Sequence, residues 1–214
     1  MPRPSNTRER RDQIASALIH VMSERGYERA SIGQIAHAAG LTQGLVHYHF
    51  GSKQEILISV LSELRRRHGK ELETALERAG SRPIRRLEAF IDLHLGPMAY
   101  RDGEALACWI FLSGQALMEP SVRSAFEGVL EGPTSALEEI IEEGLAVGDF
   151  GRGEPSSSAI ALMATIHGYF LLGATARSMI PKGSAAKETR AIASGLLAPS
   201  EPLGNPDSRG RDRQ

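Results

Sequence analysis

The chain has 214 residues, of which 41% are hydrophobic and 24% charged, a composition typical of a water-soluble globular protein. Its single cysteine, Cys108, excludes an intramolecular disulfide and a thiolate metal cluster, which favours a reducing compartment. The N-terminal segment lacks the apolar stretch of an export signal, and we find no run close to the roughly 18 apolar residues that cross a membrane. We therefore expect a cytoplasmic protein with no membrane partner.

The formal net charge of -1 hides an uneven distribution along the chain. Residues 1–55 hold seven Lys and Arg against five acidic residues, a balance of +2, so the remainder carries -3. A surplus this small predicts that any affinity for nucleic acid depends on a few well-placed phosphate contacts rather than on a broad basic field.

The first element in chain order is a helix from Thr7, as its cap, to about Arg25. Its apolar side chains recur at spacings of three and four, and Gly26 ends it. These apolar side chains are Ile14, Ala17, Leu18, Val21 and Met22.

Residues 31–53 predict two short helices joined by a tight turn, followed by the start of a third. Ser31 caps the first, Gly40 ends it in a left-handed conformation, and Thr42 caps the second. Ser52 with Glu55 three residues later predicts a capping box that opens a longer helix at residue 53. The second short helix is so polar that we expect it to face something other than its own core.

This segment resembles the DNA-binding head of the TetR family of bacterial transcriptional regulators. The resemblance covers the first quarter of the chain closely and departs from the family at Gly33, within a helix, and at His47, where an aromatic residue is frequent. The residues that carry it are Ile35-Ala36, Ala39-Gly40, Thr42, Gly44, Tyr48-His49-Phe50 and Ser52-Lys53.

A helix in the major groove presents its N-terminal residues to the base edges. We therefore expect Thr42, Gln43 and Gly44 to lie nearest to the bases. Gln43 can bond an adenine edge in two places, and the resemblance implies that Tyr48, His49 and Lys53 contact phosphates or flanking bases. The alternative is that Tyr48 packs against the first helix and His49 is merely exposed. The expected DNA-binding set is Ser31, Thr42, Gln43, Gly44, His47, Tyr48, His49 and Lys53.

No metal site is expected in this head. His47 and His49 are two residues apart, so on a helix they point in different directions and cannot chelate one ion.

The rest of the chain predicts helices alone. We expect them over residues 52–80, 83–95, 104–118, 120–145, 160–180 and 185–197. Gly132-Pro133 should kink or break the fourth near Glu131, because proline clashes with the carbonyl four residues back. Ser156 or its neighbours should cap the fifth, and residues 199–214 have too little apolar content to order themselves.

The helix over residues 160–180 is apolar nearly all round and must be covered on both sides. In a chain of this size the second cover is a partner subunit, so we expect a homodimer with a seam formed by this helix and the last one. The expected seam residues are Phe170, Leu172, Gly173, Ile192 and Leu196.

The resemblance implies a small-molecule pocket among the middle helices, with an effector whose chemistry the sequence leaves open. The layout around Trp109 and the Met118-Glu119-Pro120 junction loosely resembles the choline-responsive regulators of the family. The alternative is that most candidate lining residues belong to the core. The candidates are His94, Met98, Trp109, Phe111, Met118, Phe126, His167 and Tyr169.

Together these observations predict an all-α protein: a helix-turn-helix DNA-binding domain over residues 1–51, a helical effector-binding and dimerisation domain over 52–198, and a disordered tail over 199–214. The expected function is a TetR-type repressor that binds a palindromic operator in double-stranded DNA and is released by a small molecule. An activator, or a regulator without a ligand, is the alternative. A helical enzyme is remote, since no glycine-rich phosphate loop, paired-His metal motif or nucleophile elbow is present, and no cofactor is expected.

Overall fold

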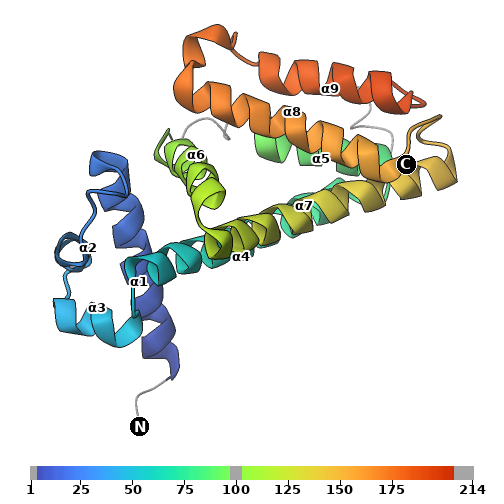
Figure 1. Cartoon of the computed structure of the whole chain (residues 1–214). Helices are drawn as coiled ribbons and strands as arrows, with labels where there is room; N and C mark the ends of the chain where they lie inside the picture. The colour runs from blue at the N-terminus through green and yellow to red at the C-terminus, as the bar shows by residue number, and fades with distance from the viewer. Residues whose placement is uncertain (1–3, 97–102, 205–214) are drawn as a thin grey trace. The chain divides into compact units, whose positions relative to one another are not determined.

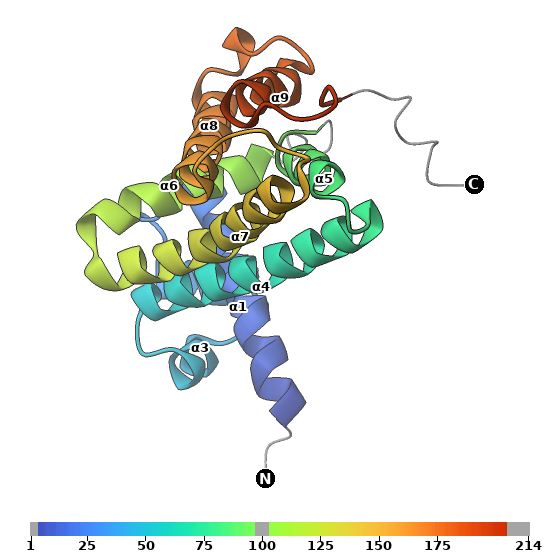
Figure 2. The same cartoon turned by 90° about the vertical axis from the view of Figure 1, so that its right-hand side faces the viewer.

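A computed structural model describes residues 4–96 and 103–204, and within these ranges the regular structure is helical. Figures 1 and 2 show the helices in two views. In chain order they are α1 (Pro4–Arg25), α2 (Ile32–Ala38), α3 (Gln43–His49), α4 (Lys53–Ala79), α5 (Pro83–Leu95), α6 (Gly103–Met118), α7 (Pro120–Val147), α8 (Pro155–Thr175), a 3₁₀ turn (Arg177–Met179) and α9 (Ser184–Leu197). The expected all-α class is confirmed.

The helices form two compact units. The first comprises Met1–His68 with Glu104–Leu130, and the second comprises Gly69–Gly103 with Glu131–Gln214. Helices α4 and α7 each contribute residues to both units.

The core of the first unit is built around α1. Ile14, Leu18 and Val21 lie on one face of this helix and are buried against α2, α3 and the first turns of α4. Helix α6 and the first part of α7 add Leu112 and Val122 to the same core. The short helices α2 and α3 are therefore held by tertiary packing rather than by their own length, which would be too small for a stable isolated helix.

The second unit packs α5, α8 and α9 together, with α8 and α9 side by side (Figure 1). The apolar face of α8 carries Ala159, Leu162, Met163 and Ile166, whose spacing of three and four is that of one helical face. At the end of α7 the ring of Phe150 lies directly on the helix backbone, because a Cβ atom at Gly144 would be 2.1 Å from this ring.

Two expected helix boundaries differ from the structure. We expected a kink or a break near Glu131, and the break does not occur, because the described helix α7 continues through Pro133. Long helical stretches flank Pro133 on both sides and its ring is buried, so the loss of one hydrogen bond is tolerated. Helix α8 is capped by Glu154 rather than Ser156: its carboxylate accepts hydrogen bonds from the backbone of Ser157 and Ser156, and these bonds lower the pKa of Glu154.

Residues 199–204, which we expected to begin a loose tail, pack onto the second unit. Ser200 donates its backbone N–H to the carbonyl oxygen of Asp149 at 2.9 Å. The carboxylate of Glu201 accepts from Arg82 at 3.3 Å and from Arg85 at 3.2 Å. The remainder of the expected tail, residues 205–214, lies outside the described residues.

Helix α8 also departs from our expectation about membrane-length segments. By length and composition alone this helix is apolar enough to cross a membrane, and it is the one such helix among the described residues. Core helices of soluble proteins pass the same test. One third of its most apolar stretch is buried within the chain, so much of the apolar surface of α8 is open.

Candidate DNA-binding site

Helices α2 and α3 and the turn between them follow directly from local sequence signals. The hydroxyl of Ser31 accepts a hydrogen bond from the backbone N–H of Gln34, whose side chain accepts from the backbone of Ser31, a reciprocal capping box. Gly40 has φ +64°, the left-handed conformation that glycine adopts without a steric penalty. Thr42 then accepts from the N–H of Leu45 at 3.2 Å and starts α3. These caps fix the angle at which α3 leaves the turn.

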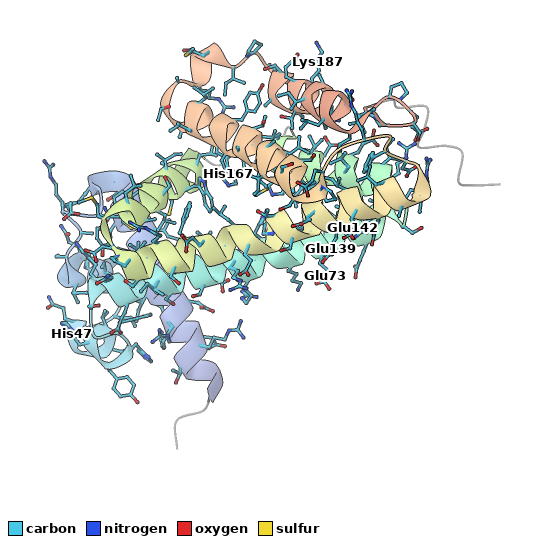
Figure 3. All side chains as sticks on the ribbon, turned by 45° about the vertical axis from the view of Figure 1, so that its right-hand side comes forward. His47, Glu73, Glu139, Glu142, His167 and Lys187 are labelled. Atoms are coloured by element: carbon cyan, nitrogen blue, oxygen red, sulfur yellow. The ribbon has the colours of Figure 1, made fainter. Side chains whose placement is uncertain are left out.

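Helix α3 is anchored from one side and open on the other. Val46 is fully buried, while Gln43, Gly44, His47 and Tyr48 are exposed. The Tyr48 side chain is 73% exposed, which rules out the alternative that it packs against α1. Figure 3 shows His47 on the outer side of α3.

Two side chains of α1, which the sequence analysis did not single out, hold the ends of both short helices. The guanidinium of Arg11 donates to the carbonyl oxygen of His49 at 2.6 Å and lies 4.0 Å from the ring centroid of Phe50. The amide of Gln13 donates to the carbonyl oxygen of Ala39 at 2.6 Å. A cation at a helix C-terminus is also favoured by the helix dipole. Arg11 had counted only as one basic residue among seven, and no local sequence signal pairs it with His49.

Lys53 is engaged inside the protein rather than held out for a phosphate. Its ammonium donates to the carbonyl oxygens of Tyr27 at 2.8 Å and Ala30 at 3.0 Å, and lies 4.1 Å from the centroid of the Tyr27 ring. Burial, with smaller effects from Glu28 and Glu119, raises the pKa of the Tyr27 phenol. Lys53 therefore ties the start of α4 to the loop between α1 and α2.

The start of α4 differs in detail from the expected capping box. Ser52 accepts from the backbone N–H of Glu55 at 3.1 Å, as expected, but the carboxylate of Glu55 accepts from Gly51 at 2.9 Å rather than from Ser52. The amide of Gln54 donates to Glu119 at 3.1 Å and to Ser121 at 2.8 Å, which joins α4 to the turn between α6 and α7 within the first unit.

The candidate effector residues divide between the two units, and Met98 lies outside the described residues. In the first unit, Trp109 and Phe126 are half-buried with ring centroids 4.7 Å apart, whereas Phe111 packs against Tyr27 at 5.4 Å. Met118, at the end of α6, is 77% exposed and does not line an enclosed space in this chain.

In the second unit the candidates are two histidines and Tyr169. His94 is buried, stacks on Phe90 with centroids 4.3 Å apart, and donates its Nδ1–H to the carbonyl oxygen of Phe90 at 2.8 Å. His167 likewise donates its Nδ1–H to the carbonyl oxygen of Met163 at 2.7 Å. Burial lowers the pKa of His167, so the neutral ring is favoured. Tyr169 is half-buried.

The candidate residues of the dimer seam differ in how exposed they are. Leu172 and Ile192 are 36% and 40% exposed, and Phe170 and Leu196 are half-buried. Gly173 is buried within its own chain, so assigning it to an exposed seam was wrong: it lies on the face of α8 that packs inward. Helix α8 instead exposes Ile160, Ala164, Gly168, Leu171, Leu172 and Thr175, a stripe at helical spacing.

Two capped short helices with a left-handed glycine between them, supported by a third helix, define a helix-turn-helix protein. Residues 14–60 match the profile of the family described as "Bacterial regulatory proteins, tetR family". The chain is 29% identical over 110 residues to the HTH-type transcriptional regulator BetI of Brucella canis, which covers 51% of this chain and 54% of that relative.

Solved structures share the fold over most of the chain. A TetR transcription regulator from Haloarcula marismortui has a TM-score of 0.78 at 19% identity, covering 88% of this chain and 98% of that one. The transcriptional regulator FadR from Bacillus subtilis in complex with stearoyl-CoA has a TM-score of 0.70 at 21% identity, covering 87% and 97%. The TetR-family match therefore lies in the N-terminal domain, over residues 14–60, and the solved structures extend the likeness in fold to most of the chain. The chain spans about half the length of the curated relatives it matches first.

Proposed function

We propose that this protein binds a palindromic operator as a homodimer, with α3 of each chain in the major groove, and regulates transcription in the bacterial cytoplasm. The observation that carries the proposal is the exposed face of α3: Gln43, Gly44, His47 and Tyr48 are open to solvent while Val46 alone is fully buried. A helix this short contacts too few bases for useful specificity by itself, so two copies on two half-sites are required.

The test begins by selecting a duplex from a random-sequence library with the unmodified full chain. Gln43→Ala should weaken the selected site by about 1 to 3 kcal/mol per half-site, and leave random DNA unaffected, because a bidentate base contact carries the discrimination. The matched control is Gln115→Ala, the same change on α6, which should leave both affinities intact. Equal losses on selected and random DNA would remove Gln43 from base readout.

The dimer seam is proposed from the open faces of α8 and α9. Ile160, Leu171 and Ile192 are 59%, 48% and 40% exposed, and Ala164 and Gly168 between the larger side chains would let a partner helix approach closely. Soluble monomers rarely leave an apolar patch of this kind in water. A second copy of the chain, seated on the same stripe by two-fold symmetry, would cover it.

Gly168→Glu tests the seam without disturbing the fold of one chain, because a Cβ atom at residue 168 meets nothing within 4 Å. Sedimentation should show the unmodified protein as a dimer at micromolar concentration and Gly168→Glu as a monomer. Gly69→Glu places the same charge at an equally open helical glycine of α4 and should remain dimeric. A compact monomer for the unmodified chain would overturn the proposal.

We propose repression relieved by a small-molecule effector as the mode of regulation. A fold neighbour, FadR of Bacillus subtilis, was solved in complex with stearoyl-CoA, which supports a small-molecule site in this fold. In this chain the half-buried Trp109–Phe126 pair of the first unit supplies the candidate contacts. An effector can release DNA only if it binds the DNA-free geometry more tightly than the DNA-bound one.

Trp109 is the only tryptophan, so its fluorescence reports binding near it. Screening long-chain acyl-CoA and quaternary ammonium compounds by this signal, then titrating a hit with and without the selected duplex, measures the coupling. Linkage requires that DNA weaken the hit by the same factor that the hit weakens DNA, typically about 5- to 150-fold. A hit indifferent to DNA would separate that pocket from the switch, and transcription from the selected site in vitro distinguishes repression from activation.

A further inference from the structure

Gly33 occupies a position in α2 where glycine is costly. Within a helix, glycine is less favourable than alanine, and nothing about the φ of Gly33 requires glycine here. Nearby residues of the same chain explain why glycine is present at this position. A Cβ atom built at residue 33 would lie 2.7 Å from Nε2 and 3.5 Å from Cδ of Gln43, and 3.9 Å from the hydroxyl oxygen of Ser31.

The carboxamide of Gln43 therefore crosses from α3 onto α2 and rests where any side chain at residue 33 would stand. Three other helical glycines, Gly44, Gly69 and Gly114, are different, because a Cβ atom at any of them meets nothing within 4 Å. A contact of 2.7 Å is closer than carbon and nitrogen atoms tolerate, so alanine at residue 33 must move this carboxamide. The movement is inexpensive, because the atoms displaced are the far end of a flexible and exposed side chain.

We propose that Gly33 is a positioning residue for DNA sequence recognition, which acts by leaving space for the Gln43 carboxamide between α2 and α3. The proposal rests on the proposed DNA-binding function and adds a determinant on α2 to the reading face of α3.

The chemistry of the carboxamide explains why its placement affects base choice. The carboxamide carries one acceptor oxygen and one donor nitrogen, and both must meet an adenine edge in the same plane for a bidentate contact. With glycine at residue 33 the group has a conformation across α2 available to it. With alanine that conformation is lost, so the carboxamide occupies the outward rotamers and meets a different base edge or a different register of the same edge.

The experiment compares Gly33→Ala with Gly69→Ala, an identical change at an open, exposed position of α4. Affinities are measured for the full chain against the duplex selected by the unmodified protein and against a panel with each half-site base pair replaced. Gly33→Ala should change discrimination at a single base pair per half-site by at least about fivefold, within the roughly 5- to 150-fold range of a bidentate contact. Gly69→Ala should leave the whole panel unchanged.

A double-mutant cycle separates action through Gln43 from a direct clash between residue 33 and DNA. In the Gln43→Ala background, Gly33→Ala should have no further effect on the panel. An effect of the same size in both backgrounds would overturn the proposal, as would a Gly33→Ala panel that matches the unmodified protein.

A measurement on the DNA-free protein tests the positioning role of Gly33 separately from the proposed DNA-binding function. The side-chain amide resonances of Gln43 in a ¹⁵N–¹H spectrum should shift in Gly33→Ala and stay in place in Gly69→Ala. Unshifted resonances in both variants would refute the positioning role even if the protein binds DNA. Another outcome is that the resonances shift while the unmodified chain shows no specific DNA binding. That result would confirm the contact between residue 33 and the Gln43 carboxamide, but it would refute the proposed DNA-binding function and, with it, the role of Gly33 in recognition.

Discussion

Replacing Lys53 by methionine removes the ammonium ion that ties α4 to the loop between α1 and α2, while keeping an unbranched side chain of similar length. In the folded protein this ion donates to two carbonyl oxygens, those of Tyr27 at 2.8 Å and Ala30 at 3.0 Å, and lies over the Tyr27 ring. If Lys53 instead served as a phosphate contact, its loss would have no effect on the DNA-free protein.

The expected loss of stability follows from these contacts. A hydrogen bond to a charged group contributes about 1.5 to 3 kcal/mol, so two of them set an upper limit of roughly 3 to 6 kcal/mol. The Lys53 side chain is only half-buried, so solvent partly screens its charge, which reduces the loss to about 2 to 3 kcal/mol. For a chain of this length each kcal/mol lowers the melting temperature by about 2 to 4 °C, so Lys53→Met should melt roughly 4 to 12 °C lower.

Thermal unfolding followed by circular dichroism gives the stability, and the slope of DNA affinity against salt gives the number of phosphate contacts. Lys53→Met should lower the melting temperature of the DNA-free protein and leave the salt slope unchanged. Lys70→Met, at an exposed position of the same helix, should leave the melting temperature unchanged. A normal melting temperature with a salt slope reduced by about one would refute this reasoning and return Lys53 to phosphate binding.

Two further changes test packing and titration in the second unit. Gly144→Ala should destabilise the protein by about 1 to 3 kcal/mol in urea unfolding, because the new Cβ atom would overlap the Phe150 ring, whereas Gly114→Ala, at an exposed and open helical position of α6, should be neutral or stabilising; equal effects would show that the ring is not packed on the backbone. His167 has a folded-state pKa lowered from 6.5 by burial, so its contribution to stability is present above pH 6.5 and is lost as pH falls through the folded-state pKa, with a slope of up to about 1.4 kcal/mol per pH unit. His167→Gln should remove this component from urea unfolding between pH 7.5 and 5, and an identical pH profile in both proteins would contradict the assignment.

The helices and the turn of the helix-turn-helix segment could be predicted because the residues that specify them lie within a few positions of one another. Ser31, Gly40 and Thr42 act on backbone groups at most three or four positions away, so spacing alone predicted both short helices and the turn. The helical pattern of the remaining chain was predictable for the same reason, since apolar periodicity of three and four identifies a helix without reference to its neighbours.

What sequence spacing could not supply was the tertiary partner of each residue. Lys53 looked like a phosphate contact because its partners, Tyr27 and Ala30, lie more than twenty residues away. Gly173 looked like part of an exposed seam because α8 is apolar on every side, and only packing against its neighbours decides which side is inward. Pro133 predicted a kink or a break, and α7 does not break there, because local rules omit the support that the flanking turns of α7 provide.

If α3 reads DNA as proposed, its division into one buried anchor and an open face has a consequence for how the protein evolves. Substitutions at exposed sites that make no buried contacts usually change stability by no more than about 0.5 kcal/mol, so Gln43, His47 and Tyr48 can be exchanged without endangering the fold. Selection for a new operator and selection for a folded head therefore fall on different side chains of one seven-residue helix. A lineage of such proteins can drift to new binding sites while Val46, Arg11 and the caps at Ser31 and Thr42 keep the helix in place.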